Sequence, residues 1–138
     1  MATINGTNQK DVLVGTSDGD QIFGLGQDDV LRGQLGNDFL SGGNGNDVLA
    51  GGPGNDFLDG GKGDDLFLFA PTANDVRQRD VITDFEQGND LIGLRGFGIT
   101  FDDLVIDDQG ARQVVTVPDS GITFVVRVEE LTAADFLF

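Results

Sequence analysis

Large apolar residues recur at every ninth position between residues 6 and 68, and each is set between polar or glycine-rich segments. They are Leu13, Ile22, Leu31, Leu40, Leu49, Leu58 and Phe67. An aspartate stands two residues before each of them, at Asp11, Asp20, Asp29, Asp38, Asp47, Asp56 and Asp65. A glycine stands five residues before each aspartate, at Gly6, Gly15, Gly24, Gly33, Gly42, Gly51 and Gly60. Three registers kept without an insertion over seven turns predict a repeat protein of the solenoid type.

Each nine-residue turn divides into a loop and a short strand. Residues Gly42–Asp47 are rich in glycine, which suits a tight loop with positive φ. Residues Val48–Ala50 suit a strand whose middle side chain points inward. We therefore expect two turns to complete one coil, with parallel sheets on opposite sides. The predicted fold is all-β, a right-handed parallel β-roll (β-solenoid) over residues 1–69 with a C-terminal β-rich cap over residues 70–138.

The aspartates give this architecture its candidate chemistry. Parallel stacking places like charges above one another, which is unfavourable unless a cation neutralises them. Calcium accepts six to eight oxygen ligands from carboxylates and backbone carbonyls, at roughly 2.3–2.6 Å. Because the loops offer only oxygen, they favour calcium over zinc or copper.

The nonapeptide array resembles the GGxGxDxUx repeats of the RTX (repeats-in-toxin) family. Residues 42–50, 51–59 and 60–68 match this motif best, and residues 33–41 lack only its second glycine. The resemblance implies that each calcium ion lies between one loop and the loop two turns later, held by aspartates and backbone carbonyls, with about five sites in all. The metal-site residues expected on this basis are Asp11, Asp20, Asp29, Gly36, Asp38, Gly43, Gly45, Asp47, Gly52, Gly54, Asp56, Gly61, Gly63 and Asp65.

The first three loops depart from the motif. Gln9 and Gln27 stand where later loops have glycine, and a non-glycine residue is strained at positive φ. Lys10 lies beside Asp11 and makes the first loop the poorest candidate for a cation.

Composition narrows the function. The chain of 138 residues suits one domain or one solenoid with a cap, and its formal net charge of −16 disfavours nucleic acid and anionic membranes as partners. Cysteine and histidine are absent, which excludes disulfides, thiol nucleophiles, histidine-based triads and most zinc sites. No long apolar run or N-terminal signal peptide is evident, so we expect no membrane insertion. Since no carboxylate pair is set to face another across a cleft, we expect no enzyme activity.

The nine-residue period is lost after Leu66–Phe69, where we place the end of the roll. A polar loop is expected over residues 70–79, followed by two strands within residues 80–85 and 88–94. The other expected elements are strands at Leu104–Ile106, Gln113–Val117 and Ile122–Val128 and one helical turn at Leu131–Asp135 with Thr132 as N-cap. The expected cap core is Phe85, Phe97, Phe101 and Phe124.

Residues 79–94 resemble the DxIxDFxxGxDxIxL block that follows the roll in serralysin-type proteases and related secreted RTX proteins, with Gly93 replacing the acidic residue before the last leucine of that block. Asp80, Asp84 and Asp90 are open to two interpretations, as calcium ligands or as caps of turns and strands. The last residues, 135–138, are similar to the uncleaved export signal of type I secretion substrates.

These features lead to one main functional hypothesis. We expect a calcium-binding module that is unfolded where calcium is scarce, leaves the cell through the type I secretion machinery and folds outside, alone or with an N-terminal cargo domain. Two alternatives remain open. One is an extracellular carbohydrate-binding module, by similarity to the RTX-type modules of alginate epimerases. The other is an adhesive or surface element that assembles through the open N-terminal coil.

Overall fold

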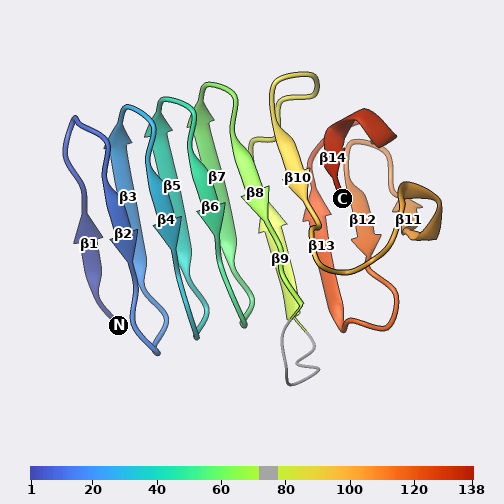
Figure 1. Cartoon of the computed structure of the whole chain (residues 1–138), viewed down its shortest axis with the longest axis horizontal. Helices are drawn as coiled ribbons and strands as arrows, with labels where there is room; N and C mark the ends of the chain where they lie inside the picture. Colours follow the sequence, from blue (N-terminus) through green and yellow to red (C-terminus); the bar gives the residue numbers. More distant parts are fainter. Residues whose placement is uncertain (72–77) are drawn as a thin grey trace.

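The chain winds as a flattened coil whose strands alternate between two sheets (Figure 1). This computed structural model describes residues 1–71 and 78–138. The eight-stranded sheet contains, in spatial order, β1 (Thr3–Asn5), β3 (Gln21–Gly26), β5 (Phe39–Asn44), β7 (Phe57–Lys62), β9 (Gln78–Ile82), β13 (Ile122–Val126), β12 (Gln113–Thr116) and β11 (Val105–Asp108). The six-stranded sheet contains β2 (Val12–Val14), β4 (Val30–Arg32), β6 (Val48–Ala50), β8 (Leu66–Leu68), β10 (Leu91–Gly93) and β14 (Phe136–Leu137).

The register of the sheets follows the sequence period. In the pairing of β3 with β5, Ile22 lies opposite Leu40, and in the pairing of β5 with β7, Leu40 lies opposite Leu58. The inward side chains therefore form two facing columns between the sheets. The fully buried members are Ile22, Leu31, Leu40, Leu49, Leu58 and Phe67. The predicted all-β parallel roll is confirmed.

Both sheets continue beyond Phe69, although the loss of the nine-residue period predicts that the roll ends there. Strand β9 pairs in parallel with β7, and β10 pairs in parallel with β8. Ile82 and Ile92 are fully buried and extend the two inward columns by one more coil. The reason is local, because the triplets Asp80–Ile82 and Asp90–Ile92 repeat the aspartate–x–apolar order of the earlier turns. Longer loops separate these triplets, so the nine-residue spacing does not reveal them.

The C-terminal segment closes this end of the roll. Strand β13 adds to β9 in parallel, and β12 and β11 follow in antiparallel order. Strand β14 adds to β10, and the short 3-10 helix η2 (Ala133–Asp135) precedes it. A second 3-10 helix, η1 (Phe101–Asp103), lies before β11.

The expected cap core largely agrees with the structure. Phe85 and Phe124 are buried, while Phe97 and Phe101 are partly buried against the same cluster. The helical turn expected at Leu131–Asp135 is found as η2, where the Thr132 N–H and Oγ1 both donate to Asp135 Oδ2. The polar loop expected over residues 70–79 falls mostly outside the described residues.

Candidate metal centre

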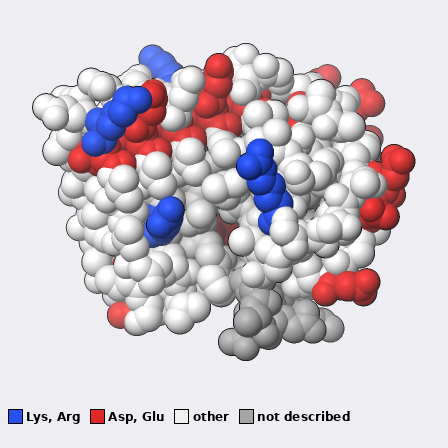
Figure 2. Space-filling model, viewed as in Figure 1, with Lys and Arg blue, Asp and Glu red and all other residues white. Residues whose placement is uncertain are grey.

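The repeat aspartates occupy the corners where each loop meets the next strand, and they stack along both edges of the roll. In each stack, Oδ1 of one aspartate accepts the backbone N–H of the aspartate one coil earlier, at 2.7–2.9 Å. The donor and acceptor pairs are Asp11 and Asp29, Asp20 and Asp38, Asp29 and Asp47, Asp38 and Asp56, Asp47 and Asp65, Asp56 and Asp80, and Asp65 and Asp90. Figure 2 shows acidic side chains gathered along one edge, above a face that is largely uncharged. The structure thus brings the predicted aspartates together as two columns of like charge.

The second carboxylate oxygen is left without a partner in five consecutive corners. These atoms are the Oδ2 atoms of Asp29, Asp38, Asp47, Asp56 and Asp65, all of which are buried and lack a hydrogen-bond partner among the residues that the structure describes. Their residues are only 1–2% exposed. An ionised carboxylate in such a place is costly unless a cation or a proton neutralises it.

The glycine that opens each loop makes room for this oxygen. A Cβ added to Gly51 would overlap Asp56 Oδ2, and a Cβ added to Gly60 would overlap Asp65 Oδ2. Neither glycine has a positive φ, so the requirement at this position is space rather than backbone conformation.

The other expected glycines give the loops their shape. The predicted site glycines all adopt positive φ, between 97° and 157°: Gly36, Gly43, Gly45, Gly52, Gly54, Gly61 and Gly63. Leu25, Gln27 and Gln34 occupy the same loop positions in earlier turns and also have positive φ, of 82°, 66° and 80°. The loops therefore adopt positive φ even at these non-glycine residues, which are strained by it, as expected from the sequence for Gln27.

Burial changes the acidity of the corner aspartates along the roll. Desolvation raises the pKa of Asp47 to about 6 and the pKa values of Asp56 and Asp65 to about 7. Asp80, which lies deeper under the cap, has its pKa raised to about 8 for the same reason. Without a cation, ionisation of these carboxyls is therefore costly in the folded chain near neutral pH.

The first two corners are built differently. Asp11 Oδ2 accepts the N–H and Oγ1–H of Thr7, at 2.6 and 2.8 Å, and Asp20 Oδ2 accepts the same two donors of Thr16, both at 2.7 Å. The Thr16 hydroxyl is the main cause that lowers the pKa of Asp20. Lys10, expected to disturb Asp11, pairs instead with Asp28. Both aspartates lie in the stacks, but their outer oxygens are already satisfied.

Sequence reasoning left three acidic residues undecided, and the structure places all of them at the end of the stacks. Asp80 and Asp90 continue the two columns through their bonds to the N–H groups of Asp56 and Asp65. Asp84 accepts the N–H groups of Gly60 and Gly61, at 3.0 and 2.6 Å. The signal that could have found the first two is the aspartate–x–apolar triplet that each of them begins.

The donor set fits a hard cation. Within residues 1–71 and 78–138, no three carboxylate, histidine or cysteine side chains converge on one point. A cation at these corners would therefore be held by the stacked aspartates together with backbone carbonyls of the glycine-rich loops. Such all-oxygen coordination suits calcium, and the five buried, unpartnered Oδ2 atoms supply the negative charge that it needs.

Coils stacked in parallel with acidic, glycine-rich corners define the class of metal-binding parallel β-rolls. Residues 5–40 and 41–68 match the family model of the RTX calcium-binding nonapeptide repeat (4 copies). Residues 5–68 of this chain are therefore RTX nonapeptide repeats, which are calcium-binding repeats.

A solved structure has the same fold. The chain is similar to the AlgE6R2 subunit of the Azotobacter vinelandii mannuronan C5-epimerase, with 25% identity, a TM-score of 0.66 and 91% of each chain covered. It also matches the AlgE6R3 subunit of the same epimerase, with 26% identity, a TM-score of 0.36, and 96% of this chain and 80% of that chain covered. The comparison with curated proteins gave no match. None of the helices in the described part of the chain is long and apolar enough to cross a membrane.

Proposed function

We propose that this chain is a module that folds into its β-roll on binding several calcium ions. The observation that carries the proposal is the row of buried carboxylate oxygens without partners at five successive corners. Two columns of like charge within one thin roll oppose folding, and calcium removes this opposition. The module binds rather than catalyses, because the chain has no histidine or cysteine to activate a nucleophile.

The size of the effect fits a switch between two calcium concentrations. For a site with a Kd on the order of 10⁻⁴ M and calcium near 10⁻³ M, binding adds about 1.4 kcal/mol to the free energy of unfolding. Several such sites together approach the stability of a small domain, roughly 5–15 kcal/mol. At cytosolic calcium concentrations this contribution disappears and the repulsion remains.

This switch supports a role in secretion. We propose that the chain passes unfolded through the type I secretion machinery and folds outside the cell, alone or attached to an N-terminal cargo domain. The C-terminal tail agrees with this order of events, because Asp135 and Phe136 are 3% and 5% exposed in the folded chain. Phe138 is 42% exposed, so a receptor can contact the whole of the tail only before the cap has folded.

A calcium titration followed by far-UV circular dichroism tests the proposal. We expect a chain without β-structure in metal-free buffer, a cooperative gain of β-structure in the millimolar calcium range, and little response to magnesium. Magnesium is the matched control because it demands a smaller and more rigid octahedral site. A chain that is already fully folded in metal-free buffer at neutral pH would refute the proposal.

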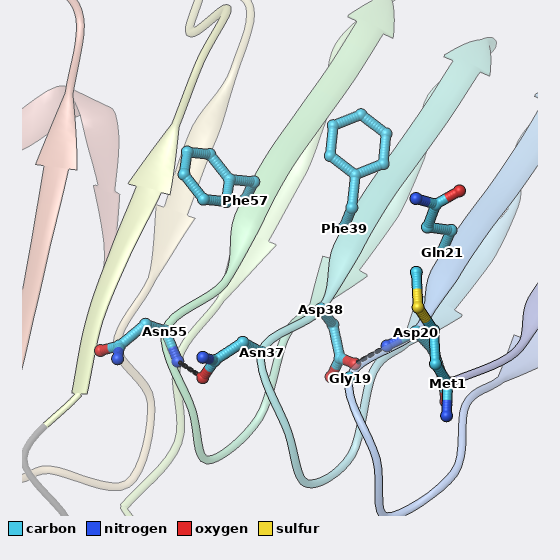
Figure 3. Close-up of a pocket in the computed structure, with 9 residues that line it drawn as sticks. All are labelled: Met1, Gly19, Asp20, Gln21, Asn37, Asp38, Phe39, Asn55 and Phe57. Carbon is cyan, nitrogen blue, oxygen red and sulfur yellow. Dashed lines mark hydrogen bonds and ion pairs between the residues drawn. The ribbon is translucent and has the colours of Figure 1, made fainter.

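A second candidate function is binding of an uncharged polysaccharide, and a groove on the outer face of the eight-stranded sheet favours it (Figure 3). The groove has a volume of about 470 Å³ and is lined by Phe39, Phe57, Gln21, Asn37 and Asn55, among others. Phe57 is 51% exposed, and such rings and amides suit the apolar faces and hydroxyls of sugars. The similarity to a subunit of a mannuronan C5-epimerase supports binding of a polysaccharide in general, while the net charge of −16 favours an uncharged one. Affinity electrophoresis in calcium through neutral and anionic polysaccharide gels tests this function, with Phe57→Ala as the loss variant. Equal mobility with and without the neutral polysaccharide would exclude it.

A further inference from the structure

The seven repeat loops fall into two conformational groups that the sequence period does not separate. Loops three to seven have positive φ at their second residues, Leu25, Gln34, Gly43, Gly52 and Gly61, and at their fourth residues, Gln27, Gly36, Gly45, Gly54 and Gly63. In the first two loops the corresponding residues lie outside the left-handed region; they are Thr7 and Thr16, then Gln9 and Asp18. Leu25, Gln27 and Gln34 keep the left-handed conformation at a cost of roughly 1–3 kcal/mol each, so glycine content alone does not explain the division.

The same division appears, independently, in the partners of the corner carboxylates. Oδ2 is buried and unpartnered in the five corners from Asp29 to Asp65. In the first two corners it accepts two hydrogen bonds from the threonine at the second loop position. Asp20 is as deeply buried as the later aspartates, at 2% exposure, so solvent access does not explain the difference.

We infer that Thr7 and Thr16 close the first two corners to cations, so that calcium enters only the corners of Asp29, Asp38, Asp47, Asp56 and Asp65. This inference rests on the proposed function, since it assigns calcium to particular corners of the same roll. The physical reason is that an amide and a hydroxyl already point their hydrogens at Asp11 Oδ2 and Asp20 Oδ2. A cation at that point would meet two positive dipole ends and would have to displace both hydrogen bonds.

Two consequences follow for the module. If each ion is shared between a loop and the loop two turns later, seven equivalent loops form five such pairs. If the first two loops are closed, three of these pairs remain among the repeats: loops three and five, four and six, and five and seven. The first coil also keeps its acidic corners satisfied without metal, so it can terminate the charged stack at the N-terminal end.

The experiment is a measurement of calcium stoichiometry by equilibrium dialysis of the full chain against calcium chloride. The matched variants are Asp56→Asn and Asp20→Asn, which remove one buried carboxylate each from an open and a closed corner. We expect Asp56→Asn to bind at least one calcium ion fewer than the wild type, and Asp20→Asn to bind the same number. Circular dichroism at saturating calcium identifies any variant that does not fold. If one of these variants does not fold, the double variant described below still tests the inference.

A gain-of-site variant gives the second arm. Thr16→Gly combined with Asp18→Gly removes the hydroxyl and gives the second loop glycine where later loops adopt positive φ. We expect this double variant to bind one calcium ion more than the wild type. The inference is overturned if Asp20→Asn loses as many ions as Asp56→Asn, or if the double variant gains none. A wild-type chain that binds no calcium would instead defeat the proposed function itself.

Discussion

The metal-free chain should fold better in mild acid than at neutral pH, because a proton can replace calcium at the buried corners. The carboxyls of Asp56, Asp65 and Asp80 have pKa values raised from 3.8 to about 7, 7 and 8, mainly by burial. A carboxyl whose pKa is higher in the folded state favours folding below its unfolded pKa. That contribution is lost as the pH rises through the folded pKa. The window of declining stability therefore runs from about pH 4 to about pH 8.

The free-energy cost of ionising these buried carboxyls decides whether the metal-free roll is folded at neutral pH. One pKa unit corresponds to about 1.4 kcal/mol, so ionising Asp56 or Asp65 in the folded state costs about 4 kcal/mol, and ionising Asp80 costs about 6 kcal/mol. All three residues are only 1–2% exposed, so solvent screens these costs little. Together they are on the order of 10 kcal/mol, as large as the whole stability of a typical domain.

The assay is circular dichroism with urea unfolding of metal-free protein at about pH 5.5 and about pH 7.5, the lower value being kept above the pI of about 4.1 for solubility. We expect β-structure and a measurable unfolding transition at the lower pH, and neither at the higher pH until calcium is added. Calcium addition at the lower pH should also release protons, because the folded metal-free chain holds them and the bound carboxyls ionise. A metal-free chain with the same urea midpoint at both pH values would refute the reasoning.

Three further changes test other parts of the structure. Leu49→Ala in the inward column should lower the free energy of unfolding in calcium by about 2–5 kcal/mol, whereas Val12→Ala, at a side chain 68% exposed, should stay within about 0.5 kcal/mol, as measured by urea unfolding. Gly51→Ala should push the Asp56 carboxylate out of place and raise the calcium midpoint in circular dichroism. Gly26→Ala is its control, since its Cβ would meet nothing nearer than 3.6 Å. Truncation after Glu130 removes the buried Leu131 and Phe136 and should cost on the order of 5 kcal/mol in calcium-bound urea unfolding; an unchanged midpoint would show that β14 does not stabilise the roll.

The repeat region could be predicted because the same nine-residue period sets both the order of residues along the chain and their stacking in the two sheets. A fixed distance from aspartate to apolar residue sets which side chain points inward, and a fixed loop length sets the register. Ile22, Leu40 and Leu58 therefore stack where the period places them. The period holds even where a loop lacks glycine, as at Gln34, because the stacked neighbours impose the loop conformation on that residue.

The end of the roll could not be predicted in the same way, because the prediction depends on a constant nine-residue spacing and the last coil does not have that spacing. Asp80 follows Asp56 by 24 residues and Asp90 follows Asp65 by 25, instead of the 18 residues of a regular coil. The parallel pairing of β13 with β9 joins segments that are distant in sequence and share no motif. The role of Thr16 was equally hidden, because a threonine in a loop gives no sign of where its hydroxyl points until the backbone is known.

A column of stacked carboxylates has to be terminated at both ends, and the chain places hydrogen-bond donors at each. At the N-terminal end, the hydroxyl and amide of Thr16 satisfy the oxygen of Asp20 that would otherwise need a cation. At the C-terminal end, Phe124 lies directly opposite Asp80 in the register of β9 and β13, so the next strand presents an aromatic residue where an aspartate would continue the column. Phe124 is fully buried and stacks on Phe69 at 4.4 Å, which ties this terminator to the core. Gln78 Nε2 also donates to Asp80 Oδ2, at 3.4 Å, and the Glu86 N–H donates to Asp90 Oδ2, at 2.8 Å. Hydrogen-bond donors therefore satisfy the terminal carboxylates at both ends, which leaves the middle corners as the part of the roll that depends on calcium.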